Sequence, residues 1–219
     1  NLERTIANSV DIAHTARSQK LPSEKLIKFL IAAEGGPLAK ELHRAGIDAT
    51  PAAVSQRRRQ IPPDVFRKVF LDFTSSSAYG QPNRGYKGYR VLACDGTAVN
   101  MARNPNALSF VCNNSAPKGY NQVHFSPLFD IYDRTYFDAV IQPAPQKDEP
   151  GTLVEMFKRN DFNHKTIIVL DRGYESYNVM ARLMNTPNVY FVLRVKHNHS
   201  AMREIARLPM LELDCDLSF

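Results

Sequence analysis

Two short apolar runs, each ended by an aspartate, constrain this chain more than any other feature of its sequence. Residues 91–94 are followed by Asp95 and a glycine, and residues 167–170 are followed by Asp171. Neither run alternates apolar with polar residues, which is typical of central strands covered on both faces. We therefore expect two buried strands, with an aspartate at the carboxyl end of each. Ligand sites of open α/β sheets form at such ends.

The rest of this region alternates between strand and helix patterns. Strands are expected at 89–94, 122–131, 135–141, 165–170 and 189–195, helices at 151–159 and 176–184, and a polar loop up to about residue 120. The order β-β-β-α-β-α-β, with a hairpin joined through helices to further strands, predicts a mixed sheet. We expect an α/β fold with a ribonuclease H-like core over residues 90–219.

Residues 1–74 show helical patterns, and the Gly-, Ser- and Pro-containing stretch 75–89 is expected to be a linker. Residues 38–60 predict a helix, a turn at Gly46 and a second helix capped by Thr50, which is the layout of a helix-turn-helix. In that interpretation this helical region binds DNA through a polar run. The run consists of Gln56, Arg57, Arg58 and Arg59. The alternative is a helical bundle whose arginines form a solvated face, and the pattern alone leaves both open.

Charge and cysteine content narrow the class of protein. The net charge is +6 and the pI about 9.3. The first 80 residues hold 12 Lys and Arg against 8 Asp and Glu, which favours an anionic partner such as nucleic acid. Three scattered cysteines argue against a disulfide framework or a cysteine zinc site, so we expect a reducing cytoplasm. No run approaches the ~18 apolar residues of a membrane span, so no membrane partner is expected.

The two aspartates together indicate a metal site. On neighbouring strands their carboxylates would repel each other unless a cation lay between them. Oxygen ligands suit Mg²⁺ or Mn²⁺, and two such ions about 3.5–4 Å apart catalyse phosphodiester displacement. Either aspartate alone would be better explained as a cap of the following turn.

Residues 89–97 (YRVLACDGT) and 168–176 (IVLDRGYES) resemble the first- and second-aspartate blocks of IS4-type insertion-sequence transposases, with the two aspartates 76 positions apart. Residues 118–121 and 190–196 also resemble that family. The resemblance implies a DDE transposase with a ribonuclease H-like core, which uses Mg²⁺ to hydrolyse one strand at the element's end. The freed 3′-hydroxyl then attacks target DNA directly.

On the family pattern, Asp95 and Asp171 are the first two catalytic acids and bind two metal ions in the complete site. The partners implied are double-stranded DNA, as element ends and target, and a second copy of the chain in a homodimer. Arg172 and Tyr174 would touch a phosphate and a frayed base at the cut end, although an ion pair and a core aromatic are equally good explanations. Further candidate DNA contacts are Lys118, Tyr120 and Asn121.

The sequence departs from the family at the third acid. The family carries this glutamate in a Y-x-x-R-x-x-x-E segment, usually after an inserted β-rich domain. Of the glutamates after Asp171, namely Glu175, Glu204 and Glu212, none lies in such a context. We expect a catalytic core truncated at its C-terminal side, and a 219-residue chain that does not cleave element ends by itself. Glu155 lies where some ribonucleases H place an acid, but an exposed helix carboxylate is the simpler expectation.

Two other functions fit the same residues. A different ribonuclease H-like metal nuclease, such as a resolvase, would use both aspartates to cleave without joining the cut end to a target. A non-catalytic DNA-binding relic of a transposase would depend on residues 38–60 and not on Asp95. We expect the protein to be associated with DNA in a bacterial cytoplasm in each case.

Overall fold

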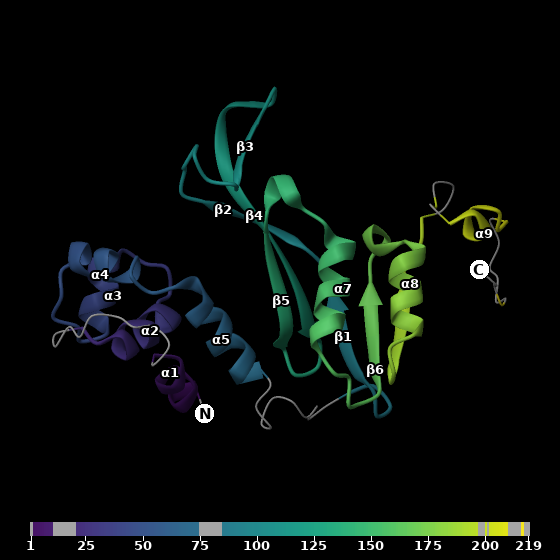
Figure 1. The fold of residues 1–219 in the computed structure, drawn as a ribbon, viewed down its shortest axis with the longest axis horizontal. Helices are drawn as coiled ribbons and strands as arrows, with labels where there is room; N and C mark the ends of the chain where they lie inside the picture. The colour runs from purple at the N-terminus through teal and green to yellow at the C-terminus, as the bar shows by residue number, and fades with distance from the viewer. Residues whose placement is uncertain are drawn as a thin grey trace. The chain divides into compact units, whose positions relative to one another are not determined.

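The computed structural model describes residues 2–10, 21–74, 85–196, 200, 202–209 and 216. The chain divides into two compact units, residues 1–81 and 82–219, and each has its own hydrophobic core (Figure 1). Of the expected linker, residues 75–84 lie outside the described residues. The described part of this linker, residues 85–89, makes a tight turn in which Tyr86 and Tyr89 exchange backbone hydrogen bonds of 2.9 Å.

The described part of the first unit is helical, as the sequence predicts. It contains α1 (Leu2–Val10), α2 (Ser23–Ala32), α3 (Leu38–Arg44), α4 (Pro51–Arg58) and α5 (Pro63–Thr74). Gly46, with φ of 61°, takes the left-handed conformation past the end of α3. Thr50 caps α4, because its side chain accepts a 3.2 Å hydrogen bond from the Ala53 amide. Helix, glycine turn and capped helix therefore follow one another as expected. No described helix of the chain has the length and apolar content needed to cross a bilayer.

The second unit is built on a mixed sheet. Its strands are β1 (Arg90–Cys94), β2 (Thr97–Met101), β3 (Phe110–Asn113), β4 (Ala116–Asp130), β5 (Thr135–Pro143), β6 (Thr166–Leu170) and β7 (Val189–Leu193). The core order is β5-β4-β1-β6-β7, with β4 antiparallel to β5 and β1, and with β1, β6 and β7 parallel. This is the ribonuclease H-like arrangement, so the predicted α/β fold class is confirmed.

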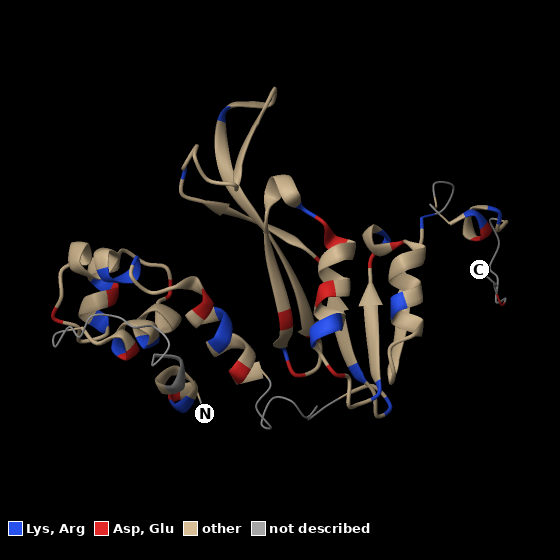
Figure 2. Cartoon of the chain, viewed as in Figure 1, with Lys and Arg blue, Asp and Glu red and all other residues tan. Residues whose placement is uncertain are grey.

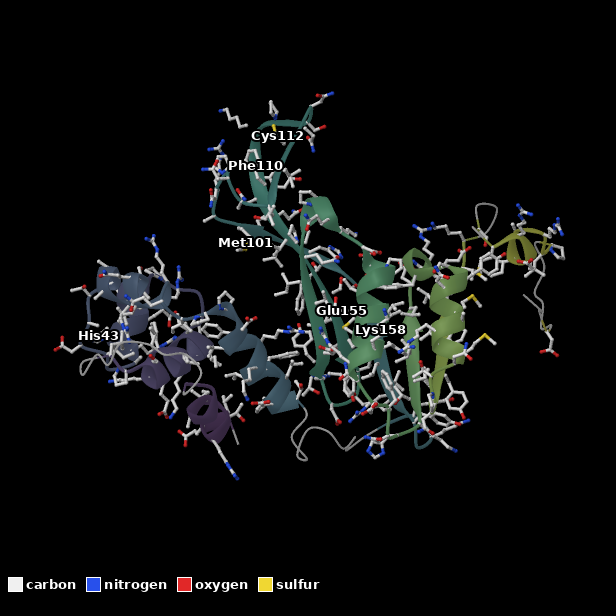
Figure 3. All side chains as sticks on the ribbon, viewed as in Figure 1. His43, Met101, Phe110, Cys112, Glu155 and Lys158 are labelled. Carbon is white, nitrogen blue, oxygen red and sulfur yellow. The ribbon has the colours of Figure 1, made fainter. Side chains whose placement is uncertain are left out.

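The expected polar loop before residue 120 is wrong, because this segment contains β2, β3 and the start of β4. All five residues of β2 are exposed, so the strand has no apolar alternation to reveal it. Pairing with β4 forms it instead, with Thr97 opposite Phe125 and Met101 opposite Asn121. Together β2, β3 and the first half of β4 form an arm that extends from the core sheet (Figures 1 and 3).

Two helices, α7 (Glu149–Arg159) and α8 (Tyr177–Met184), lie side by side on one face of the core sheet (Figure 1). Their apolar residues share a core with β1, β4 and β6. Its buried members on these helices are Leu153, Met156, Phe157, Val179 and Leu183. Helix α7 begins two residues before its expected start because Asp148 caps it, accepting a 2.9 Å hydrogen bond from the Gly151 amide. The earlier start places Glu149 in the first turn.

Candidate active site

The parallel pairing of β1 with β6 brings Asp95 and Asp171 to the same edge of the sheet. Cys94 lies opposite Leu170 in the register, and each aspartate is the next residue of its strand's chain. The two carboxylates therefore leave neighbouring strands at equivalent positions. This is the placement that the sequence predicts, at the strand ends where open α/β sheets form ligand sites.

Asp171 is held as a carboxylate by its neighbours. Its Oδ1 accepts hydrogen bonds from the Arg172 amide at 2.6 Å and from Arg194 Nε at 2.7 Å. The Arg172 amide, followed by the Arg194 guanidinium, lowers the pKa of Asp171. Asp95 is exposed, and its Oδ1 accepts a 2.8 Å hydrogen bond from the Gly96 amide. Sequence reasoning missed Arg194, although it directly follows β7 just as the aspartates follow β1 and β6.

Beneath this edge, Cys94 and Tyr174 form a buried pair. Tyr174 is 1% exposed, and its hydroxyl lies 3.2 Å from Cys94 Sγ. Burial raises the pKa of the Cys94 thiol to about 12, and the negative charges of Asp95 and Glu149 act in the same direction. Tyr174 is therefore a core aromatic, not a surface that a frayed base could reach. Of the two explanations that the sequence left open, its burial between the strand ends and the helices favours the core aromatic.

A third carboxylate, that of Glu149 at the start of α7, lies against both aspartate loops. A Cβ built on Gly96 would collide with Glu149 Oε1 and His124 Nε2, and one on Gly173 would lie 3.4 Å from Glu149 Oε2. Glu149 Oε1 is 2.9 Å from His124 Nε2 and 3.0 Å from Lys147 Nζ. Figure 2 shows acidic residues at the first turn of α7 and just beyond the end of β6. No motif in the sequence singled out Glu149.

The donor set fits part of a hard-cation site. Asp95 and Asp171 supply carboxylate oxygens, which Mg²⁺ and Mn²⁺ prefer, and Asp171 is kept ionised. Glycines at positions 96 and 173 keep side chains out of the space beside the carboxylates. Within the described ranges, no group of three or more His, Cys, Asp or Glu side chains stands close enough together to hold a metal ion. Asp95 and Asp171 are therefore the candidate ligands because of their positions in the β1–β6 register.

The helix-turn-helix residues lie on and just after α4. Gln56, Arg58 and Arg59 are exposed, whereas Arg57 is half-buried and donates a 2.6 Å hydrogen bond to Gln60. Three of the four predicted DNA contacts are thus available at the surface of the first unit.

The other candidate DNA contacts differ in their surroundings. Lys118 and Tyr120 are exposed on the arm, and Arg172 is exposed beside Asp171. Asn121 is only 2% exposed, and its amide bonds to both backbone groups of Asn104. A direct contact of Asn121 with DNA would require these hydrogen bonds to break. Asn121 therefore stabilises the structure of the arm.

The remaining glutamates lie in structural pairs or beyond the described residues. Glu175 is buried and accepts hydrogen bonds from the Lys196 amide and the Ser200 hydroxyl. Glu204 accepts a 2.6 Å hydrogen bond from the Tyr177 hydroxyl, and Glu212 lies outside the described residues.

Glu155 is the exposed helix carboxylate that the sequence predicts. Its side chain is 52% exposed and pairs with Arg159 one turn later, at 2.8 Å (Figure 3).

Comparisons with known proteins gave one family match and two weak structural likenesses. One solved structure similar to this chain is a piggyBac transposase synaptic complex with hairpin DNA, with a TM-score of 0.44 and 14% sequence identity over 97% of this chain and 44% of that chain. Another is a Mos1 transposase paired-end complex with the left transposon end, with a TM-score of 0.31 and 11% identity over 86% of this chain and 61% of that chain. The chain thus spans less than two thirds of either protein, and likenesses this weak carry no statement about function. No curated protein matches the chain in sequence. Residues 86–212, more than half of the chain, match the family described as the transposase DDE domain, and the chain belongs to that family.

Proposed function

We propose that this chain carries the catalytic core of an IS4-type insertion-sequence transposase, which cuts and joins phosphodiester bonds at the ends of its element. The observation that supports the proposal is the parallel register of β1 and β6, in which Asp95 and Asp171 follow paired residues of neighbouring strands. Family membership supports the reaction class. The IS4-type assignment depends on the two aspartate blocks, residues 89–97 and 168–176.

In this proposal Asp95 and Asp171 hold divalent cations, Mg²⁺ or Mn²⁺, with two ions in the complete site. When bound, such ions supply the charge that activates the attacking oxygen and stabilises the leaving oxygen of the phosphodiester. The Arg172 amide and Arg194 keep Asp171 ionised and therefore ready to bind a cation. The Arg172 and Arg194 side chains are exposed at this edge and would be available to a DNA phosphate, Arg194 in exchange for its ion pair with Asp171.

The proposed partner is double-stranded DNA, both as element ends and as target, in the cytoplasm of a bacterium. The exposed residues of α4 and its end, with Lys118 and Tyr120 of the arm, supply the proposed contacts. We further propose that the active complex is a homodimer. The described acids fall short of three convergent ligands, so we expect the 219-residue chain to bind cations without cleaving element ends.

Calorimetric titration of the purified chain with Mn²⁺ tests the site. Wild type should bind the ion, and Asp95→Asn and Asp171→Asn should each weaken binding. The matched control is Asp161→Asn, which removes an exposed carboxylate that precedes β6 instead of following it, and it should bind as wild type does. Binding that is indifferent to both active-site substitutions would overturn the proposal.

A DNA assay separates the transposase from the resolvase-like nuclease. The substrate is a plasmid that carries the DNA flanking the gene, incubated with Mg²⁺, the purified chain and a second plasmid as target. The wild-type chain should bind the flanking DNA without nicking it. Robust cleavage by the 219-residue chain would contradict the expected inactivity. Cleavage without any joining to the second plasmid would favour the resolvase-like nuclease.

A further inference from the structure

The arm lies in the longest stretch of this chain without an acidic residue. The chain has 22 Asp and Glu, but none of them lies between Asp95, before β2, and Asp130, at the end of β4. Arg103 and Lys118 lie within this stretch, and both are exposed. Figure 2 shows blue segments and no red on the arm. The arm therefore attracts a polyanion and has no carboxylate of its own to repel it.

Arg103 is held in place without being neutralised. Among the described residues no carboxylate pairs with Arg103 or Lys118. Arg103 instead donates from Nε and Nη2 to the Lys118 carbonyl, at 3.3 and 2.9 Å, and its guanidinium lies 5.7 Å from the centre of the Phe110 ring. Phe110 packs on Gly119, where a Cβ would collide with the ring. A guanidinium has five N–H donors, and the carbonyl uses two of them. Because Arg103 is already ordered, binding a phosphate through the other donors costs little side-chain entropy.

The loop that joins β2 to β3, residues 102–109, is also fixed to the arm. Asn121 of β4 accepts a 2.6 Å hydrogen bond from the Asn104 amide. Its own amide group donates to the Asn104 carbonyl and to the Ser109 hydroxyl, both at 2.9 Å. Both ends of the loop are thus tied to the same strand, so the loop presents its exposed side chains in a defined geometry.

The exposed side chains of this loop suit a groove of DNA. Leu108 is 75% exposed, and Arg103 and Asn106 are exposed in the same loop. Proteins that bind the minor groove of DNA combine Arg and Asn side chains with an apolar side chain, such as Leu, that inserts between base steps. The loop carries this combination within six positions, next to the unpaired cations of the arm.

We propose that the arm binds duplex DNA, with Arg103 and Lys118 on phosphates beside the minor groove and Leu108 in the groove. This inference rests on DNA as the partner in the proposed function. It assigns part of the DNA binding to the catalytic unit itself, in addition to the helix-turn-helix, and it does not depend on the proposed cation site.

Fluorescence anisotropy of a labelled mixed-sequence duplex, titrated with the full 219-residue chain at several salt concentrations and without divalent cations, tests the inference. Arg103→Gln with Lys118→Gln should lower the slope of log affinity against log salt by about 0.9 for each phosphate contact that is lost. The control is Arg134→Gln with Lys158→Gln, which removes the same charge from exposed positions in the β4–β5 turn and on α7. This control should keep the wild-type slope.

A third variant separates the groove contact from the effect of charge. Leu108→Ala leaves the charge unchanged, so it should weaken DNA binding about tenfold at an unchanged salt slope, the equivalent of burying most of one leucine side chain. The matched control is Met184→Ala, a residue of α8 that is 69% exposed, and it should bind DNA as wild type does. All of these positions are exposed, so the variants should fold, which circular dichroism checks.

The outcomes separate this inference from the proposed function. Wild-type affinity and slope in the arm variants would overturn the role of the arm. The exposed apolar residues Val99 and Met101 of β2 would also suit a protein partner, and a changed sedimentation coefficient of the arm variants at unchanged DNA binding would indicate such a partner instead. A wild-type chain that binds no duplex would overturn DNA as the partner altogether. Mn²⁺ binding should be the same in the arm variants as in wild type, so a failure of the cation site is seen independently.

Discussion

Asp171 and Arg194 occupy equivalent positions on neighbouring strands, each one residue past the paired Leu170 and Leu193, and Arg194 Nε donates to Asp171 Oδ1 at 2.7 Å. The register of β6 and β7 thus places an arginine as the counter-charge of the second candidate metal ligand. The Arg194 side chain is 68% exposed and the Asp171 side chain 45% exposed, so this ion pair adds little to the stability of the fold. Its main effect is on the pKa of Asp171.

Replacing Arg194 by glutamine should raise the pKa of Asp171, because the carboxylate loses a cationic hydrogen-bond donor. The pKa should stay below the ordinary value, since the Arg172 amide is the larger cause of the shift and remains in place. Carbon-13 NMR titration of the carboxyl groups measures this directly. Arg103→Gln is the control, because that guanidinium bonds to the Lys118 carbonyl instead of a carboxylate.

The same substitution changes how stability depends on pH. A lowered pKa stabilises the fold above the ordinary aspartate pKa, and that contribution disappears as the pH falls through the folded-state value. As the pH falls below about 4, the Arg194→Gln variant should therefore lose less stability than the wild type does. An Asp171 titration identical in both proteins would show that the pair does not form in solution.

Gly96 and Gly173 should respond differently to alanine. A methyl group at position 96 would collide with Glu149 and with His124, which is too buried to move aside, so we expect a loss of about 1–3 kcal/mol. At position 173 the same methyl would lie 3.4 Å from Glu149 Oε2, an ordinary contact, and the effect should be small. Urea unfolding of the two variants provides the comparison. Equal effects would mean that Glu149 and His124 do not lie against Gly96.

Cys94 and Cys112 should differ in reactivity toward iodoacetamide. Cys94 is 2% exposed with a thiol pKa of about 12, whereas Cys112 is exposed on the arm (Figure 3). Because the thiolate is the reactive form, peptide mapping by mass spectrometry at pH 8 should find Cys112 alkylated and Cys94 intact in the folded protein. In denaturant both should react.

The raised pKa of Cys94 also has a consequence for stability. The folded state keeps this proton to higher pH than the unfolded state, so the contribution is complete below pH 9 and falls as the pH rises toward 12. Rapid alkylation of Cys94 in the native state would contradict its placement under the strand ends.

Local patterns were enough to predict the elements that hold the aspartates. Apolar runs before Asp95 and Asp171, Gly46 after a helix and Thr50 before one each depend on a few neighbouring residues, and the structure has all four as expected. Strand β2 could not be predicted in this way, because it is fully exposed and exists through its pairing with β4.

The missed site residues are non-local for the same reason. Glu149 lies against Gly96 and is paired with His124 of β4, which are both far from it in the sequence. Arg194 meets Asp171 only through the register of β6 and β7. Such contacts between distant segments cannot be predicted from residue spacing, whereas the carboxyl end of an apolar strand can be.

The helix-turn-helix interpretation makes a prediction that its alternative, a solvated basic face, does not. Replacing Arg58 and Arg59 together by alanine should weaken DNA binding and lower the salt dependence of binding by about one unit of slope for each arginine, since each contact to a phosphate releases counterions. Fluorescence anisotropy of a labelled duplex at several salt concentrations measures both quantities. The control, Lys25→Ala with Arg67→Ala, removes the same charge from exposed positions of α2 and α5. If DNA contacts the end of α4, only the first pair lowers the slope. If the two pairs behave alike, general charge is the cause and the helix-turn-helix interpretation is wrong.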